Sequence, residues 1–407
     1  MPKIHKITTA VKAAVLITIS TTFFGVNAFA NDEYSDGLLK VKKLFSINEL
    51  KALAQPYEGV VTGNGKQRGL FAVEASGIST KPIVEAAQAF LDRLSTPQKI
   101  RTQFAIDDRE WRRWSNVDNA IYMRNGVSLK ELDAGGRAAA RAILNTSLSV
   151  KGLALSQAIM KTDQTLREIN GGSEFLDEEL YFFTIMGVPS ETEPWGWQLD
   201  GHHIVINYFV MGDQVVMTPT FLGAEPAVTT TGKYAGNEVL QEEQNAGLAF
   251  MQSLSPAQQM AATLDARKTK DDMRAGANAD NLVLDFAGLK ASNMTAAQRN
   301  QLLRLTGLFV NNMKEGHAKI RMDQVAAHMD ETYFSWVGTA ADDAVFYYRI
   351  HSPVILIEFD HQIPIGTTSV NLGKTPIRDH IHVIIRTPNG NDYGKDLLGQ
   401  HLRAHAH

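Results

Sequence analysis

The segment WGWQLDGHHIVINYFVM, residues 195–211, decides the fold of this 407-residue chain. Its two apolar runs, 195–199 and 204–210, have the aromatic and β-branched composition that strands favour. The polar segment DGHH at 200–203 separates them, and the turn signal MGDQ at 211–214 leads into a further strand that Pro219 ends. We therefore predict a block of antiparallel strands here, with a pair of histidines at one strand end.

A second histidine cluster begins another predicted strand. His380 and His382 lie in the segment DHIH at 379–382, which precedes the apolar run 383–385. Between the two clusters, and before the first, the apolar spacing is helical over most of 82–169 and again over 249–309. Helical parts that precede strand parts favour an α+β fold over a parallel α/β sheet.

Short segments recur in the same order in the two halves of the chain. The echoes pair 89–97 with 249–256, 181–187 with 333–338, 197–208 with 347–359, and 216–219 with 384–388. Such recurrence is typical of a diverged tandem duplication, although short apolar runs also resemble one another by chance. We predict two α+β repeats, 31–235 and 236–407, packed as one pseudo-symmetric unit.

The first thirty residues have the features of a signal peptide. Three lysines precede a largely apolar stretch at 13–26, and Ala28 and Ala30 provide the small residues of a cleavage site. We predict cleavage after Ala30 and a periplasmic or extracellular location for 31–407. Loss of three lysines and no acids changes the formal charge from −4 to −7. We predict no membrane span after the leader.

Composition excludes several classes of function. The chain has no cysteine, which rules out disulfides, thiolate ligands and thiol nucleophiles. Its acidic charge makes nucleic acid an unfavourable partner. The glycine-rich segment 63–69 is followed by a strand pattern rather than a helix, so we expect no phosphate loop and no nucleotide cofactor. A small molecule remains a plausible ligand.

The histidine clusters are the strongest chemical signal. Side chains two apart on a strand point to the same face, so His380 and His382 would reach one metal ion together. His202 and His203 are adjacent, and only one of them would join the cluster unless Gly201 places both on a turn. Neutral imidazole binds zinc, iron and copper, and two or three histidines leave coordination positions open.

Three other residues are candidate metal ligands. Glu358 and Asp360 end the apolar run 354–359 and lie on one face of the predicted strand. Either carboxylate with two histidines would match the iron facial triad. His401 lies near the end of the chain, before His405 and His407, which we expect to form a solvated tail. The candidate metal ligands are His202, His203, His380, His382, Glu358, Asp360 and His401.

Two alternatives stay open. A histidine among apolar residues is often a core residue with hydrogen-bonded nitrogens, so the clusters can be structural. Trp195, Trp197, Tyr347 and Tyr348 can line a pocket for a sugar or another flat ligand, or they can be ordinary core residues.

Three groups of residues resemble one known family. These are WQLDGHH at 197–203, TPTFLGAEP at 218–226, and HIH at 380–382 together with NDYG at 391–394. In these motifs the chain resembles the family called domain of unknown function 3500. The resemblance extends over most of residues 31–407 and implies one domain-length unit. It implies no activity, substrate or catalytic residue.

From the sequence we predict an exported α+β protein with a histidine-rich site for a divalent metal. If the site is catalytic, a metal-dependent hydrolase or oxygenase fits best, because the metal would activate water or polarise an oxygen. The alternative is a non-catalytic binding or structural protein of the periplasm or the cell exterior.

Overall fold

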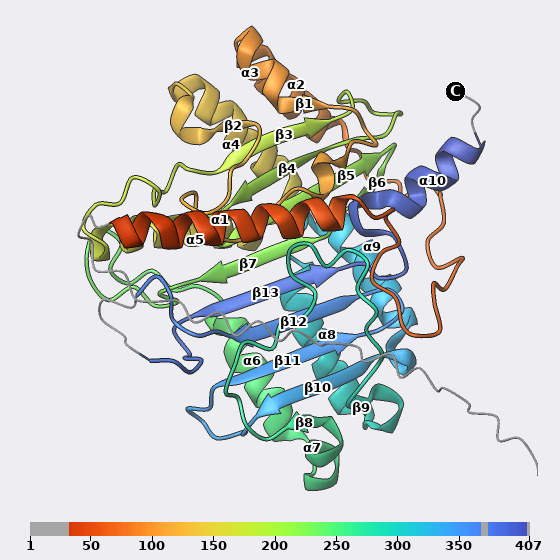
Figure 1. Cartoon of the computed structure of the whole chain (residues 1–407). Coiled ribbons are helices and arrows are strands. Elements are labelled where there is room, and N and C mark those ends of the chain that lie inside the picture. Colours follow the sequence, from red (N-terminus) through yellow and green to blue (C-terminus); the bar gives the residue numbers. More distant parts are fainter. Residues whose placement is uncertain (1–31, 368–372, 405–407) are drawn as a thin grey trace, which may run out of the picture.

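The computed structural model describes residues 32–367 and 373–404 and shows a mixed α+β fold. A long mixed sheet forms its centre, with the strand order β1-β3-β4-β5-β7-β13-β12-β11-β10-β8 (Figure 1). Short strands β2, β6 and β9 pair with β3, β5 and β10 beside this path. The predicted signal peptide lies outside the described residues.

Most of the sheet is antiparallel, and its two outermost pairings, β1 with β3 and β8 with β10, are parallel. The strands are β1 (Gln103–Phe104), β2 (Val127–Ser128), β3 (Phe182–Met186), β4 (Trp195–Gly201), β5 (Ile204–Met211), β6 (Gln214–Val216), β7 (Thr220–Ala224), β8 (Thr263–Asp265), β9 (Leu289–Lys290), β10 (Tyr333–Gly338), β11 (Phe346–His351), β12 (Leu356–His361) and β13 (Ile381–Arg386).

Helices cover one face of the sheet, and α1 crosses the other (Figure 1). The helices are α1 (Asp32–Leu53), α2 (Lys81–Arg93), α3 (Thr96–Thr102), α4 (Ala134–Ser147), α5 (Val150–Ile169), α6 (Gln241–Ser253), α7 (Pro256–Ala262), α8 (Ala296–Val310), α9 (Glu315–Ala327) and α10 (Lys395–Ala404). Single turns of 3₁₀ helix are Arg109–Arg112, Leu129–Glu131, Ala291–Asn293, Met329–Glu331 and Asp392–Gly394. None of the helices in the described part of the chain is both long and apolar enough to span a membrane.

Local sequence explains several of these boundaries. Ser95, Ser255 and Thr295 begin α3, α7 and α8 with reciprocal capping boxes, in which the serine or threonine and a glutamine three residues later satisfy free N–H groups. Ser128 and Glu131 have the spacing of a capping box, but Ser128 makes no side-chain cap bond and instead pairs in β2. Asp133 caps α4 instead and accepts the N–H of Gly136.

An Asn-Gly pair between β-prone runs is typical of a hairpin, but the segment around Asn64 does not form a pair of regular strands. Thr62 and Gly65 close a turn, but Val61 bridges to Val283 rather than to its own neighbours. Gly59 also packs against a distant segment, since a Cβ on it would come within 2.5 Å of the backbone of Gly390. This segment therefore contacts distant parts of the chain, at Val283 and Gly390, instead of forming a local hairpin.

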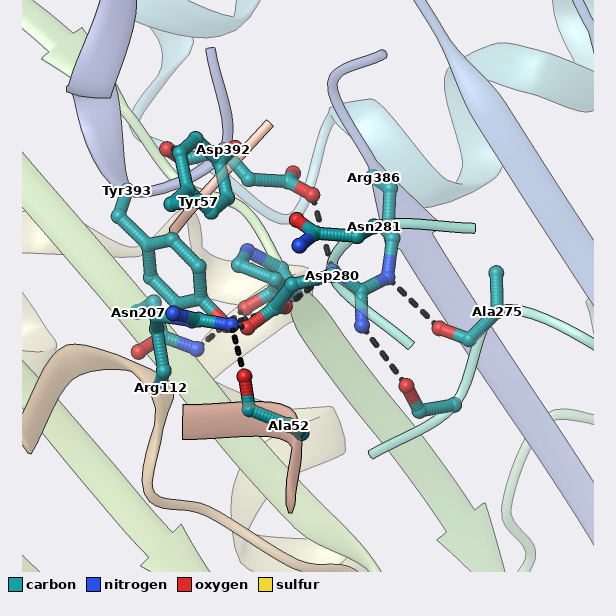
Figure 2. A network of polar contacts seen from close by, with 12 residues as sticks. Ala52, Tyr57, Arg112, Asn207, Ala275, Asp280, Asn281, Arg386, Asp392 and Tyr393 are labelled. Carbon is teal, nitrogen blue, oxygen red and sulfur yellow. Dashed lines mark hydrogen bonds and ion pairs between the residues drawn. The ribbon is translucent and has the colours of Figure 1, made fainter. Parts of the chain in front are cut away.

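A buried polar network on the α1 face joins distant parts of the chain (Figure 2). The guanidinium of Arg386 contacts Asp280 at 2.9 Å and Asp392 at 3.0 Å, and it donates to the carbonyl of Ala275 at 2.6 Å. Arg112 binds the other oxygen of Asp280 at 2.8 Å. We call this set the Arg386 network, and it ties β13 to the loop before β9.

The Arg386 network also accounts for an arginine between two buried indoles. Trp111 and Trp114 are core residues. Arg112 is buried as well, and it donates to the carbonyls of Ala52 and Gln55 at the end of α1 and to Asp280. A buried arginine is acceptable here because carboxylate and carbonyl oxygens surround its N–H groups.

Candidate metal centre

The β4–β5 turn brings the first histidine pair to one end of the sheet. Gly201 pairs with Ile204, so His202 and His203 form a two-residue turn rather than part of a strand. His203 has a φ of 62°, and its N–H donates to the carbonyl of Asn116 at 3.1 Å. The turn therefore does not separate the two histidines to opposite faces, which the sequence left open.

The start of β13 supplies the second pair. His380 and His382 lie two residues apart and point to one face, as predicted. In the central strand pairing, His382 lies opposite Gly223 of β7. A Cβ at Gly223 would lie 3.1 Å from ring carbons of both His203 and His382. The glycine therefore leaves the space in which the two pairs meet.

His203, His380 and His382 form one cluster. Each offers a ring nitrogen, and the three nitrogens lie within 4.8 Å of one another. The Nε2 atoms of His380 and His382 are 3.0 Å apart. Ligand nitrogens of a tetrahedral zinc ion are about 3.3 Å apart, because each Zn–N bond is about 2.0–2.1 Å. The cluster could therefore hold a metal ion after small side-chain movements.

The cluster is buried. The three residues are 3 %, 1 % and 9 % exposed in chain order. Burial, with the neighbouring imidazoles, lowers the pKa of His203 and of His382 well below the usual value for histidine. Both side chains therefore stay neutral, which is the form that binds metal. The Nδ1 atom of His203 has no hydrogen-bond partner among the described residues.

Two oxygen atoms orient His380. Its Nδ1 donates to the carbonyl of Ile363 at 2.7 Å and lies 3.4 Å from Oε2 of Glu225. A proton held on Nδ1 leaves the lone pair on Nε2, toward His382. An imidazole with this kind of carboxylate or carbonyl partner is typical of metal sites, where the partner fixes the ring and raises its basicity.

Glu225 is itself held in place. It follows β7 directly, is buried, and accepts the backbone N–H groups of Ile365, Gly366 and Thr367 and the hydroxyl of Thr367. Burial alone would raise the pKa of Glu225, but His380 and these hydrogen bonds together lower it. The side chain therefore presents a fixed negative charge to the His380 ring.

His202 lies beside the cluster rather than in it. Its ring stacks on that of His203 with 3.9 Å between centroids. Its Nδ1 donates to Asp163 of α5 at 2.6 Å, and the other oxygen of Asp163 accepts the hydroxyl of Tyr181. Burial opposes the charged imidazole, but the Asp163 carboxylate outweighs it and raises the pKa of His202. This histidine–aspartate pair resembles a general acid or base.

Glu358 and Asp360 lie near the cluster, but their oxygens are engaged elsewhere. Asp360 pairs with His382 across β12 and β13, yet it binds Lys268 at 3.0 Å and the N–H groups of Asp272 and Met273. Glu358 accepts from the backbone of 274–275 and from a tyrosine hydroxyl. Both carboxylates fasten the loop between β8 and β9.

His401 lies at a different place in the fold. It is on α10, 3.9 Å from Glu193, and lines a cavity with Met211 at the end of β5. His203 precedes the start of β5, so the length of this eight-residue strand, about 26 Å, separates the two ends. The structure therefore does not bring His401 to the three-histidine cluster.

Sequence reasoning missed Glu225, Gly223 and Asp163. Glu225 and Gly223 belong to the motif at 218–226 that marks the family resemblance, but no spacing rule connects them to His380. Asp163 is a buried acid on α5, and such an acid must have a partner. The burial of Asp163 indicates that its carboxylate has a partner, but it does not identify His202 as that partner.

The four aromatic residues considered for a ligand pocket are core residues. Trp195, Trp197, Tyr347 and Tyr348 are almost fully buried. Trp197 stacks on Tyr208 with 5.1 Å between centroids, and the hydroxyl of Tyr347 donates to Glu358. Their polar atoms and ring faces are directed into packing rather than toward a cavity.

Comparisons with known proteins give one match. No curated protein and no solved structure matches the chain. A family model described as "Protein of unknown function (DUF3500)" matches residues 76–395, which include the three-histidine cluster, Gly223 and Glu225 and exclude α1 and His401. The chain therefore belongs to this family of proteins of unknown function, DUF3500.

Proposed function

We propose that the protein binds one divalent transition-metal ion through His203, His380 and His382. The observation that carries the proposal is the convergence of three buried imidazoles from two distant segments, with their ring nitrogens within 4.8 Å. Two further features support it. His203 Nδ1 has no hydrogen-bond partner among the described residues, and Glu225 and a carbonyl fix the His380 ring as in known metal sites.

The ligand set favours zinc or copper over iron in a facial triad. A facial triad requires a carboxylate, and Asp360 is the carboxylate paired with His382. Asp360 would have to give up Lys268 and two backbone N–H groups to reach a metal. Three imidazoles without a carboxylate match a tetrahedral site that keeps one position open.

A titration tests metal binding directly. The chain is ended at Ala404 to remove His405 and His407, stripped of metal, and titrated with Zn²⁺ in competition with a chelating dye. We expect one tight equivalent, and a loss of at least 100-fold in affinity for His380→Ala/His382→Ala. His328→Ala is the matched control, because His328 lies at the end of α9 and contacts the carbonyl of Gln324.

Equal zinc affinity in the double variant and the parent would contradict the proposal. If the double variant does not fold, His203→Asn serves instead, because asparagine tolerates the positive φ of this turn position. A circular-dichroism spectrum of each variant separates a loss of ligands from a loss of fold.

A second candidate function, a metal-dependent hydrolase for small substrates, is favoured by His202 and Asp163. A bound metal would lower the pKa of a coordinated water. His202 lies against His203, and Asp163 holds one of its nitrogens, so the ring is placed to accept a proton beside the centre. The burial of the cluster restricts access to small groups.

His202→Gln tests this second function separately from metal binding. We expect the variant to keep one zinc equivalent and to lose at least 10-fold in zinc-dependent hydrolysis of p-nitrophenyl acetate, because general acid–base groups contribute about 10²- to 10⁴-fold. An unchanged rate would remove His202 from the chemistry and leave the metal proposal intact.

We also infer that the two halves derive from a duplication. Supporting this, the order helix, helix, short strand, helix, helix and antiparallel strands occurs twice around the central β7–β13 pair. Gly126 and Gly288 have the same role, since each precedes a short strand, β2 or β9, and a Cβ there would meet a carbonyl of the strand paired with it, at Phe183 of β3 or Phe334 of β10. In this strand order the counterpart of β13 in the first half is β7. The sequence comparison instead pairs residues 384–388 with 216–219, which lie just before β7.

On this division the centre belongs to both halves. His203 and Glu225 come from 31–235, and His380 and His382 come from 236–407.

The proposed export of the chain after cleavage at Ala30 has its own test, which is the N-terminal sequence of the protein recovered from the cell exterior or periplasm. An N-terminus at Asn31 is expected, and an intact Met1 would contradict it.

A further inference from the structure

A second site is suggested by a cavity on the helix-covered side of the sheet. The cavity has a volume of about 220 Å³ and lies where α9 faces the start of β7 and the end of β13, with Thr220, Ile385 and Thr387 in its wall. The metal centre is at the opposite ends of these two strands. From His382 to Thr387 the chain advances about 17 Å, so the two sites are separate.

The cavity wall is largely apolar. Side chains from the segment before α2, from β6, α8 and α10 contribute to it: Phe71, Val215, Phe309, Val310 and Leu397. An apolar cavity of this size suits a small organic molecule better than a chain of waters.

Helix α9 directs a cation toward this cavity. His317, Arg321 and Gln324 recur at helical spacing and all line it. Arg321 donates to the carbonyl of Val354, to Oγ1 of Thr387 at 3.0 Å and to Oε1 of Gln324 at 3.0 Å. All three acceptors are neutral. Within the described residues no carboxylate oxygen lies within 4.0 Å of this guanidinium.

Arg321 therefore has donors to spare and no carboxylate bonded to it, since Asp392, the acid whose charge acts on it, is bound to Arg386. A guanidinium has five N–H donors, and the three hydrogen bonds leave two of them available. Arg321 is half-buried, and the loss of water around its charge lowers its pKa, while the Asp392 carboxylate opposes that shift. An anion in the cavity would offset the cost of that loss, and the planar carboxylate is the group that matches a guanidinium best.

His317 adds a second polar contact. It is 5 % exposed, and its Nε2 donates to the carbonyl of Asp213 at 3.1 Å. That bond assigns the proton to Nε2 and makes Nδ1 an acceptor. Nδ1 is buried without a hydrogen-bond partner in the described part of the chain. A buried acceptor without a donor is costly, so a ligand hydroxyl or N–H would complete it.

We propose that this cavity binds a small organic acid, with its carboxylate on Arg321, its apolar body against the α8 and β6 side chains, and a hydroxyl or N–H on Nδ1 of His317. The proposal is independent of the metal centre. The acidic side chain in the wall, Glu74, is exposed at the rim and does not neutralise Arg321.

Calorimetric titration with matched probes tests the proposal. The metal-stripped protein in EDTA is titrated with benzoate, hexanoate and mandelate, and with benzamide and hexanamide as neutral counterparts. We expect the acids to bind at least 10-fold more tightly than the amides, and mandelate to bind more tightly than benzoate. EDTA excludes carboxylate binding to a metal, and His380→Ala/His382→Ala should bind the acids like the parent.

Variants assign binding to this cavity. Arg321→Gln should lose at least 10-fold in affinity for the acids and little for the amides, and His317→Asn should remove the preference for mandelate. Arg304→Gln is the control, since Arg304 is exposed on α8. Equal binding of acids and amides, no binding of any acid at 10 mM, or unchanged affinity in Arg321→Gln would overturn the proposal. The acid–amide comparison on the unaltered protein holds even if Arg321→Gln does not fold.

Discussion

At the scale of single residues, the cluster depends on side chains that do not bind the metal themselves. Glu225 and the carbonyl of Ile363 hold the proton of His380 on Nδ1 and so point its lone pair at the centre. Gly223 leaves the space that a Cβ would take from His203 and His382. The three-histidine site therefore includes β7 although β7 contributes no ligand.

Glu225→Gln should weaken zinc binding by about 10- to 100-fold without abolishing it, since partners of ligating histidines contribute on this order. The variant removes the negative charge beside His380 and keeps the size of the side chain. Zinc competition titration measures the change. Thr367→Val is the matched control, because it removes one hydrogen bond to Glu225 and keeps the charge. Unchanged affinity in Glu225→Gln would mean that Glu225 only anchors the 365–367 loop.

His351 provides a prediction on pH that does not involve the metal. Burial, with repulsion from Arg349, lowers its pKa to about 3. The unfolded chain takes up this proton near pH 6.5 and the folded chain does not, so stability is present above pH 6.5 and falls as pH falls toward 3. The slope from one such histidine is about 1.4 kcal/mol per pH unit.

His351→Phe should reduce this acid sensitivity. From pH 7 to pH 5 the parent protein should lose about 2 kcal/mol more unfolding free energy than the variant. This value is the slope of about 1.4 kcal/mol per pH unit taken over the roughly 1.5 units between the unfolded pKa and pH 5. Urea unfolding in EDTA at the two pH values measures it. Phenylalanine keeps the contact with Phe286, whose ring centroid lies 4.6 Å from that of His351. Parallel losses in both proteins would show that His351 is protonated in the folded state.

At the scale of elements, the buried acids of β12 hold a loop. Asp360 and Glu358 accept N–H groups from four consecutive residues, 272–275, which otherwise would lie unpaired over the sheet. Burial raises the pKa of Asp360 to about 7, and Lys268 and these hydrogen bonds oppose the rise. The carboxylates that the sequence offered as ligands are explained by the fold.

Asp360→Ala should therefore lower stability and leave the metal in place. We expect a loss of about 3–5 kcal/mol, because Lys268 keeps only Asp272 of its two carboxylate partners and the N–H groups of Asp272 and Met273 lose their acceptor. Urea unfolding measures the loss, and the zinc equivalent should remain one. Asp265→Ala, at an exposed position of β8, should cost less than about 1 kcal/mol. Loss of zinc from a folded Asp360→Ala protein would restore Asp360 as a ligand.

The sequence predicted the elements better than the site. Period-two and helical spacings, the cap residues Ser95, Ser255 and Thr295, and the 211–214 turn indicate β5, β6, α3, α7 and α8, since each of these elements depends on neighbours in the chain. His380 and His382 share a face for the same local reason. By contrast, the Asp163–His202 contact joins residues 39 apart, and only the packing of α5 on the sheet creates it.

At the scale of the whole molecule, the Arg386 network connects segments that are far apart in sequence. Asp280 accepts from Arg112, Arg386 and Tyr393, and Arg112 reaches back to the end of α1 (Figure 2). Because Asp392 also binds Arg386, the network joins α1, the loop before β9, β13 and the chain that leads to α10. The donors of Arg112, Arg386 and Tyr393 are bonded to the carboxylates of Asp280 and Asp392, so the network specifies one arrangement of these segments.

Asp280→Ala should be among the most damaging single changes. It leaves two buried guanidinium groups with less negative charge, and we expect a loss of about 3–5 kcal/mol in unfolding free energy. Urea unfolding with metal removed measures it. Asp323→Ala is the control, since Asp323 forms an exposed pair with Lys319 on α9. Equal effects of the two substitutions would show that the network contributes nothing specific.

The most direct test of the metal centre is an anomalous difference map at the zinc edge, from crystals of the protein loaded with one equivalent of Zn²⁺. We expect one peak, about 2.0–2.2 Å from a ring nitrogen of each of His203, His380 and His382. A peak at another position, such as the cavity beside His401, would contradict the three-histidine metal centre. The absence of any anomalous peak beside His203, His380 and His382 would contradict it as well.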